Sequence, residues 1–309
     1  MTDKNVEIVT ISTENKFYYP TLVESCKKNK GKLTTLGMNE KWQGYNWKFR
    51  KMIDYLSNLS DDKIVCFVDG YDVISCRDLT DLADEFIKLK NKHKCKIVVG
   101  CDDYGFTGKK IFTTLSFRKC DSHYLNSGTY IGYVKDVKDI ISKIYELNPS
   151  DAEDDQVLMI QYYNKYPGEI HIDYECKLFL VLFYPLMSID YFTPFTISNN
   201  TLFSNEFKTM PFFIHAPGNG FLDSIIIKMG YKNMDKNIKK KLIYSIADKA
   251  YYHSKRLIID YKYIILTLVI ILALLVYYIK SNTNKWNHIN YRNNVNKGIR
   301  GIISKSVKK

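Results

Sequence analysis

The chain has 309 residues, of which 46% are hydrophobic and 25% charged, a balance that excludes a disordered protein and suits one large α/β domain with an appendage. The formal net charge is +12, but the lysines are spread thinly and concentrate only near the C-terminus, so a nucleic-acid partner is not expected. The seven cysteines contain no Cys-x-x-Cys pair, and their odd number argues against a complete disulfide framework and favours a reducing compartment.

Apolar runs alternate with amphipathic helical patterns from residue 1 to about residue 200, which is typical of a largely parallel sheet with helices on both faces. Residues 1–5 are polar and residues 6–11 alternate like a first strand, so no secretory signal is expected there. Residues 64–68 and 96–100 are predicted buried strands, and residues 79–89 have helical spacing. The pattern predicts a nucleotide-binding α/β domain.

Two aspartates, Asp69 and Asp72, directly follow the predicted strand at residues 64–68. Open α/β sheets bind ligands beyond the carboxyl ends of their strands, and two hard oxygen donors suit Mn²⁺ or Mg²⁺. The two residues are therefore candidate metal ligands. The alternative is an ordinary exit from a strand into a loop, with both aspartates solvated.

Two further segments carry polar groups that need an explanation. Residues 124–133 read YLNSGTYIGY and place a polar turn between apolar flanks, and residues 153–156 read EDDQ just before a predicted helix. Like charges this close are costly unless a metal, a polar substrate or water compensates them. Acidic residues at a helix start are also common as caps, so both interpretations of the acidic cluster stay open.

Taken in order, these segments resemble the glycosyltransferase domain of the procollagen lysyl hydroxylases and its viral relatives. That family has a D-x-x-D after a strand, a YLNSG-x-x-IG segment and a D-D-Q segment, which match residues 69–72, 124–132 and 154–156. Residues 37–44 and 48–50 are similar to its W-x-G and K-x-R elements, and residues 176–179 to its C-K-I-F element. The resemblance covers roughly residues 5–220 and implies an α/β, GT-A-like, Rossmann-type domain that binds a nucleotide sugar.

The resemblance also implies a metal-dependent donor site. Asp69 and Asp72 would hold Mn²⁺ (or Mg²⁺) on the diphosphate of a UDP-sugar, and His215, from an H-x-N-G element, would be the third ligand. A lone histidine is more often structural, but the apolar run before His215 and the Gly-Asn-Gly turn after it favour the ligand. Asp154 and Asp155 would face the sugar and the acceptor as catalytic residues. The residues that would bind the donor are Trp42, Lys48 (near the phosphates), Tyr71 (stacked on the uracil ring), Asn126, Gly128, Gln156, Asn219 and Gly220.

The chain departs from the family pattern at three places. It reads His-Ala-Pro-Gly-Asn-Gly from His215, two residues longer than H-x-N-G, so Asn219 and Gly220 carry over less directly than the histidine. Thr129 replaces the second glycine of the family's S-G-G, and the tryptophan expected after residues 97–99 is absent. Acceptor recognition is therefore expected to differ, and collagen modification is not assumed.

Residues 263–279 form an uncharged apolar run with tyrosines at both ends, about the length that crosses a bilayer as a helix, although a buried core helix is the alternative. The predicted organisation is a glycosyltransferase domain at 1–225, a basic juxtamembrane helical segment at 226–260, a transmembrane helix at 261–280 and a basic tail at 281–309. Lysine and arginine flank both ends of the run, so the distribution of charge does not decide the orientation. The missing secretory signal favours a single-pass membrane protein whose domain is cytosolic over one whose domain is lumenal.

The sequence thus predicts a transferase that moves a hexose, glucose or galactose, from a UDP-sugar to a hydroxyl acceptor, with hydroxylysine or another protein or glycan group as the acceptor. Asp154 or Asp155 would take or steer the acceptor's proton. A catalytically inert, membrane-anchored sugar-binding or scaffold protein and a nucleotide-sugar hydrolase are the alternatives. The anomeric outcome and the oligomeric state stay open.

Overall fold

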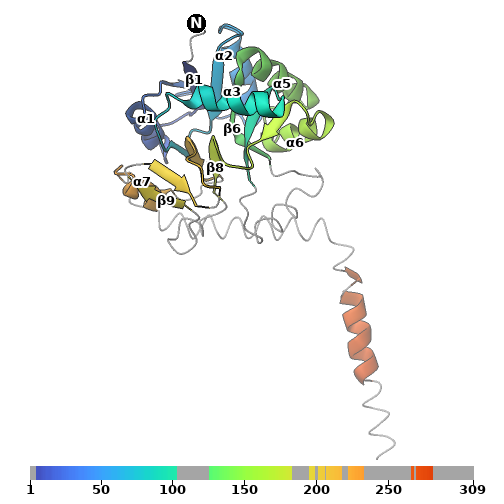
Figure 1. The fold of residues 1–309 in the computed structure, drawn as a ribbon. Helices are drawn as coiled ribbons and strands as arrows, with labels where there is room; N and C mark the ends of the chain where they lie inside the picture. The colour runs from blue at the N-terminus through green and yellow to red at the C-terminus, as the bar shows by residue number, and fades with distance from the viewer. Residues whose placement is uncertain are drawn as a thin grey trace, which may run out of the picture. The chain divides into compact units, whose positions relative to one another are not determined.

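The computed structural model describes residues 5–102, 125–182, 195–198, 201–205, 207–217, 222–232, 266–267 and 269–280. The chain divides into two units, Met1–Ala247 and Asp248–Lys309. The first unit is built on a six-stranded sheet in the order β2-β1-β3-β6-β5-β7, and Figure 1 shows helix α3 lying across one face of it.

The strands of this sheet are mostly parallel, as the sequence predicts. β1 pairs in parallel with both β2 and β3, and β5 pairs in parallel with β7. Only β6, which lies between β3 and β5, runs antiparallel to its neighbours. The strand bounds are Val6–Ile11 for β1, Leu33–Leu36 for β2, Ile64–Val68 for β3, Ile97–Cys101 for β5, Leu125–Tyr133 for β6 and Ile170–Ile172 for β7.

Helices cover both faces of the sheet because successive strand residues point to opposite sides. In β3, Val65 and Phe67 belong to one apolar cluster, and Cys66 and Val68 belong to the other. The first cluster also takes residues from α2 (Trp47–Leu56), α5 (Val134–Leu147) and α6 (Asp155–Lys165). The second takes residues from α1 (Tyr19–Lys28) and α3 (Leu82–His93).

A smaller sheet continues from the end of β3 and completes the candidate site. Its order is β4-β11-β8, with bounds Val73–Ser75, Phe213–His215 and Phe179–Val181. β11 lies antiparallel to β4, with His215 opposite Val73. A hairpin of β9 (Phe195–Ser198) and β10 (Thr201–Ser204) and the short helix α7 (Asp223–Lys228) complete the described part of this unit.

The turn predicted at residues 124–133 is wrong, because residues 125–133 form one continuous strand, β6. Its polar side chains, including Asn126, Ser127 and Thr129, are buried within the strand and are not at a solvated turn. The irregularity lies in the pairing instead: Gly100 pairs with Asn126 and the preceding Val99 pairs with Tyr130, so three residues of β6 bulge between them. Such a bulge redirects the backbone next to a site.

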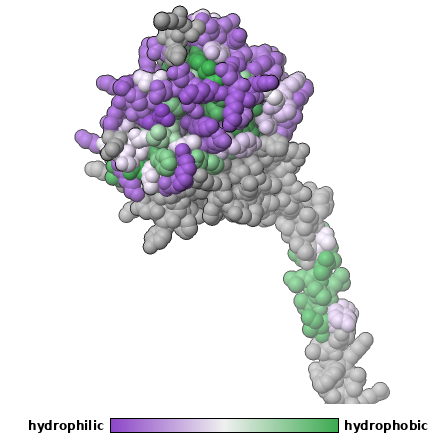
Figure 2. Space-filling model, in the orientation of Figure 1, coloured by the Kyte–Doolittle hydropathy of each residue, from purple (hydrophilic) through white to green (hydrophobic). Residues whose placement is uncertain are grey.

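The second unit is described only at residues 266–267 and 269–280, which are helical and which Figure 2 shows as mostly hydrophobic. Over the part of the chain that the structure describes, there is no helix with the length and apolar character needed to cross a membrane. The predicted span at 261–280 is only partly within that part. Residues 233–260 of the predicted juxtamembrane segment and the tail at 281–309 lie outside it.

Candidate metal centre

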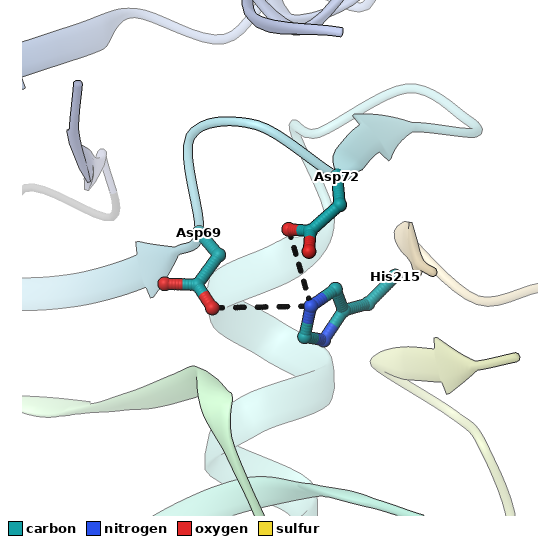
Figure 3. A group of neighbouring side chains, drawn as sticks. All are labelled: Asp69, Asp72 and His215. Atoms are coloured by element: carbon teal, nitrogen blue, oxygen red, sulfur yellow. Dashed lines mark ion pairs between the residues drawn. The ribbon is translucent and has the colours of Figure 1, made fainter. Parts of the chain in front are cut away.

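Asp69, Asp72 and His215 come together at the carboxyl end of β3. One ligand atom from each lies within 4.8 Å of the other two. The His215 Nε2 atom is 3.3 Å from Asp72 Oδ1 and 3.9 Å from Asp69 Oδ2, as Figure 3 shows. The His215 side chain is only 2% exposed, whereas Asp69 is 24% exposed. His215 therefore forms the buried side of the cluster, and Asp69 lies on its more exposed side.

Backbone pairing explains why residues so far apart in sequence meet here. Asp69 directly follows β3, and its N–H donates to the carbonyl of Gly128 in the bulge of β6 at 2.8 Å. Asp72 directly precedes β4, and its carbonyl accepts from the N–H of Ala216 at 2.8 Å. The β4–β11 pairing thus fixes His215 beside Asp72, and the β3–β6 pairing fixes Asp69.

The donor set fits a divalent cation. Among the described residues, His215 Nε2 and Asp72 Oδ1 are buried and have no hydrogen-bond partner, although they face each other. Two acceptor atoms in contact repel unless a proton or a metal ion lies between them. Two carboxylates and an imidazole are a suitable set for Mn²⁺. The sequence prediction of these three ligands therefore has a geometry that can bind a metal.

Burial and charge interactions together shift the pKa of two members of the cluster. Burial alone would lower the pKa of His215, but the carboxylates of Asp72 and Asp69 outweigh it and raise that pKa. Burial raises the pKa of Asp69, and the negative charge of Asp72 adds to this, against the opposing effect of Lys48. The carboxylate neighbours of His215 therefore decide the direction of its shift, whereas burial decides that of Asp69.

Lys48, in the first turn of α2, lies between two carboxylates. Its Nζ atom is 2.9 Å from Asp69 Oδ1 and 2.9 Å from Asp155 Oδ2, and its side chain is 9% exposed. Burial alone would lower the pKa of Lys48, but the two carboxylates outweigh it and raise that pKa, so the ammonium is charged. The structure thus links Asp155, at the start of α6, to the candidate metal cluster through one buried cation.

Asp154 is the N-cap of α6. Its Oδ1 atom accepts from the N–H groups of Gln156 at 3.0 Å and Val157 at 3.2 Å, which is the capping geometry that the sequence left open. Burial and the neighbouring Asp155 raise the pKa of Asp154. Asp154 therefore has a structural role, and its catalytic role stays a prediction.

Two of the predicted donor-binding residues contact the candidate metal ligands. Asn126 Oδ1 lies 3.0 Å from His215 Nδ1, and a Cβ added at Gly128 would lie 2.4 Å from His215 Cε1 and 2.5 Å from Asp69 Oδ2. Gln156 does not contact the cluster directly. Its Nε2 atom donates to Asp102 Oδ2 at 3.3 Å, and Asp102 in turn accepts from Asn126. These three residues belong to the same part of the fold as the cluster.

The remaining predicted donor-binding residues are less directly connected. The Tyr71 hydroxyl is within hydrogen-bond distance of the N–H groups of Thr13 at 2.9 Å and Glu14 at 3.1 Å, which orients its ring at the end of β1. Trp42 is 39% exposed and packs edge-on against Trp47. Asn219 and Gly220 lie outside the described residues.

Sequence reasoning missed Asp102, which follows β5 directly and accepts from Asn126 Nδ2 at 3.0 Å. The signal was available, because β3 and β5 point in the same direction and Asp102 follows its strand as Asp69 follows β3. Arg50 belongs to the K-x-R element read from the sequence, but the contact of its guanidinium with Asp151 at 2.6 Å, which holds α2 to the loop before α6, was not predicted. That contact joins residues about 100 positions apart and has no local signal.

The sheet with helices on both faces makes this unit an α/β domain, and the Asp-Asp-His cluster at the carboxyl end of β3 gives it a candidate metal site. The family model described as the PLOD GT domain, a glycosyltransferase domain, matches residues 2–240, and the chain belongs to this family. The resemblance drawn from the sequence motifs is thereby confirmed.

The curated relatives include animal and viral proteins. The chain is 26% identical over 178 residues to a multifunctional procollagen lysine hydroxylase and glycosyltransferase of Caenorhabditis elegans, with 54% of this chain and 24% of that protein covered. It is 22% identical over 202 residues to the uncharacterized protein R699 of Acanthamoeba polyphaga mimivirus, with 62% and 41% covered. The chain thus matches about a quarter of the length of the nematode relative.

Among solved structures, a glycosyltransferase involved in the glycosylation of the major capsid of PBCV-1 is similar to this chain. It is 12% identical, with a TM-score of 0.46, and the match covers 72% of this chain and 98% of that one.

Proposed function

We propose that the chain is a metal-dependent glycosyltransferase of the GT-A type, which transfers a hexose, glucose or galactose, from a UDP-sugar to a hydroxyl acceptor. The observation that carries this proposal is the Asp69, Asp72 and His215 cluster, with buried acceptor atoms that face each other without a hydrogen-bond partner among the described residues. Membership of a glycosyltransferase family supports it.

In this proposal Asp69, Asp72 and His215 hold Mn²⁺ or Mg²⁺. A divalent ion bound there would neutralise negative charge on the departing UDP. Lys48 keeps its positive charge beside Asp69 and Asp155, so it offsets their mutual repulsion. In this proposal the same ammonium group also attracts the phosphates of the donor. Tyr71 presents its ring to the uracil, with its hydroxyl anchored at Thr13 and Glu14.

A carboxylate at the start of α6 takes or steers the proton of the acceptor hydroxyl. Asp155 is held by Lys48, and Asp154 has a raised pKa, which favours acceptance of a proton. The proton leaves the acceptor oxygen for a carboxylate oxygen while that acceptor oxygen forms the new bond to the sugar's anomeric carbon and the bond to UDP breaks. The candidate acceptors are hydroxylysine, other protein hydroxyl groups and glycans.

A nucleotide-sugar hydrolase would use the same metal ligands with water as the acceptor, and an inert sugar-binding scaffold would keep them without turnover. The test is the release of UDP from UDP-glucose and UDP-galactose, with Mn²⁺ or EDTA and with or without each acceptor. The proposal predicts release that depends on both the metal and an acceptor. Equal release without any acceptor would favour the hydrolase, and no release under any condition would favour the scaffold.

A further inference from the structure

We infer that Asn126 is a positioning residue for the metal site: it holds the proton of His215 on Nδ1, so that Nε2 is presented to the cation, and through Asp102 it connects this ligand to Gln156 of α6. The inference rests on the proposed function, since it concerns the way in which the same metal site is kept in a binding-competent form. His215 comes from β11, Asn126 from β6 and Gln156 from α6.

The first step is the orientation of the Asn126 amide. The backbone N–H of Gly128 can only donate, and it lies 3.0 Å from one terminal atom of Asn126, so that atom is the oxygen. The other terminal atom is then the amino nitrogen, which donates to Asp102 Oδ1 at 3.0 Å. Each end of the amide thus has a partner that would be lost or repelled if the side chain were turned over.

The second step is the protonation of the histidine. The Asn126 oxygen, already fixed as an acceptor, lies 3.0 Å from His215 Nδ1, so this contact is attractive only when Nδ1 carries a hydrogen. A neutral imidazole with Nδ1–H has its lone pair on Nε2, and Nε2 is the atom that faces Asp72 and Asp69. Asn126 therefore favours the one tautomer that can bind a metal in this cluster.

The third step extends the connection to α6. Asp102 accepts from Asn126 through one oxygen and from Gln156 Nε2, at 3.3 Å, through the other. Asp102 follows β5 and Gln156 lies in the first turn of α6, directly after Asp154 and Asp155. The hydrogen bonds thus run from the metal ligand to the helix start that carries the two acidic residues. Partners of metal-binding histidines typically alter metal affinity by 10- to 100-fold when they are removed.

The experiment compares three variants with the wild type. Asn126→Leu has a similar shape and removes all three side-chain contacts, those with Gly128, Asp102 and His215. Asn126→Asp keeps an acceptor for His215 Nδ1–H but loses the donor to Asp102, and Gln156→Leu removes only the far end of the connection. Mn²⁺ affinity is measured from the electron paramagnetic resonance signal of the free ion, and circular dichroism reports the fold. We expect Asn126→Leu to weaken Mn²⁺ binding about 10- to 100-fold and Gln156→Leu to weaken it less. Asn126→Asp, which keeps the acceptor for His215 but turns a second carboxylate oxygen toward Asp102, should also weaken it less than Asn126→Leu does.

A second readout separates positioning from packing. With diamagnetic Mg²⁺ bound, the Nδ1–H proton of His215 should give a slowly exchanging downfield resonance coupled to ¹⁵N, assigned by its loss in His215→Gln. This resonance should be present in the wild type and absent in Asn126→Leu. A folded Asn126→Leu variant with unchanged Mn²⁺ affinity and an unchanged resonance would overturn the inference. If that variant does not fold, unchanged Mn²⁺ affinity in Gln156→Leu, together with a lost affinity in Asn126→Asp, would overturn it.

Failure of the proposed metal site would give a different result in the Mn²⁺ titration. In that case the wild-type protein itself would not bind Mn²⁺, whereas failure of the inference leaves wild-type binding intact.

Discussion

At the scale of single residues, Gly128 leaves room for the side chains of two candidate metal ligands, Asp69 and His215, which pack against it. A Cβ at this position would lie 2.5 Å from Asp69 Oδ2 and 2.4 Å from His215 Cε1, closer than non-bonded atoms approach. We therefore expect Gly128→Ala to displace both ligands, to weaken Mn²⁺ binding and to lower the free energy of unfolding by about 1–3 kcal/mol.

The matched control is Gly168→Ala, because a Cβ there meets no atom within 4 Å. Urea unfolding and Mn²⁺ titration of the two variants provide the measurement. Equal Mn²⁺ affinity in Gly128→Ala and the wild type would show that the glycine is not needed for the ligand geometry.

The residues of the candidate site could be predicted from sequence to the extent that local signals mark them. Asp69 and Asp72 follow a strongly apolar strand, and His215 is the last residue of another, so their positions can be read from the sequence. The hydrogen bonds of Asn126 and Asp102 could not be predicted, because they depend on the bulge in β6 and on a pairing register that no local pattern encodes.

At the scale of elements, Lys48 joins α2 to the ends of β3 and α6. Its replacement by methionine leaves Asp69 and Asp155 near each other without the buried cation between them. Removal of one partner from a buried ion pair costs about 3–5 kcal/mol, and the partial exposure of Asp69 places the expected loss at the lower end. We expect Lys48→Met to lower the free energy of unfolding by about 3 kcal/mol in EDTA, and by less in Mn²⁺.

Lys51→Met is the control on the same helix, because Lys51 pairs with the more exposed Glu40 at 2.5 Å and such pairs contribute about 0–1 kcal/mol. Urea unfolding with EDTA or Mn²⁺ measures both variants. A Lys48→Met protein as stable in EDTA as Lys51→Met would refute the view that Lys48 compensates two carboxylates.

Strands could be predicted from the sequence where their apolar residues form a regular pattern. The strands expected at residues 6–11, 64–68 and 96–100 correspond to β1, β3 and β5 within one residue. The expected turn in residues 124–133 is wrong because the polar residues of β6 are buried beside the site. A rule that equates polar with solvated fails where a strand supplies polar side chains to a site.

At the scale of the whole molecule, buried thiols support the expectation that the domain does not depend on disulfides. Cys26, Cys66, Cys76 and Cys95 are buried free thiols in the described part of the chain. Burial raises the pKa of Cys26 to about 12, so its reactive thiolate is scarce at neutral pH.

We expect these four thiols to resist alkylation in the native protein and to react fully in urea, as read by peptide mass spectrometry. A reducing agent should leave the melting temperature unchanged. Rapid native labelling of any of the four would contradict this description of the core.

We also propose that the apolar segment that includes residues 269–280 attaches the protein to a membrane and that the first unit faces the cytosol. All described site residues lie in the first unit, so a chain truncated after residue 255 should keep UDP-sugar turnover and lose co-sedimentation with lipid vesicles. The full-length chain is the control. Retained vesicle binding after truncation would place the attachment elsewhere, and in sealed cell-derived vesicles, protection of the first unit from protease added on the cytosolic side would contradict the orientation.

The most direct test of the central claim, that Asp69, Asp72 and His215 hold a divalent ion that binds the donor, is a calorimetric titration of UDP in Mn²⁺ and in EDTA. The cluster predicts that UDP binds the wild-type protein in Mn²⁺, that binding disappears in EDTA, and that Asp72→Asn, which keeps the shape of the side chain but not its charge, behaves in Mn²⁺ as the wild type does in EDTA. UDP affinity that is the same in Mn²⁺ and EDTA, or unchanged in Asp72→Asn, would contradict it.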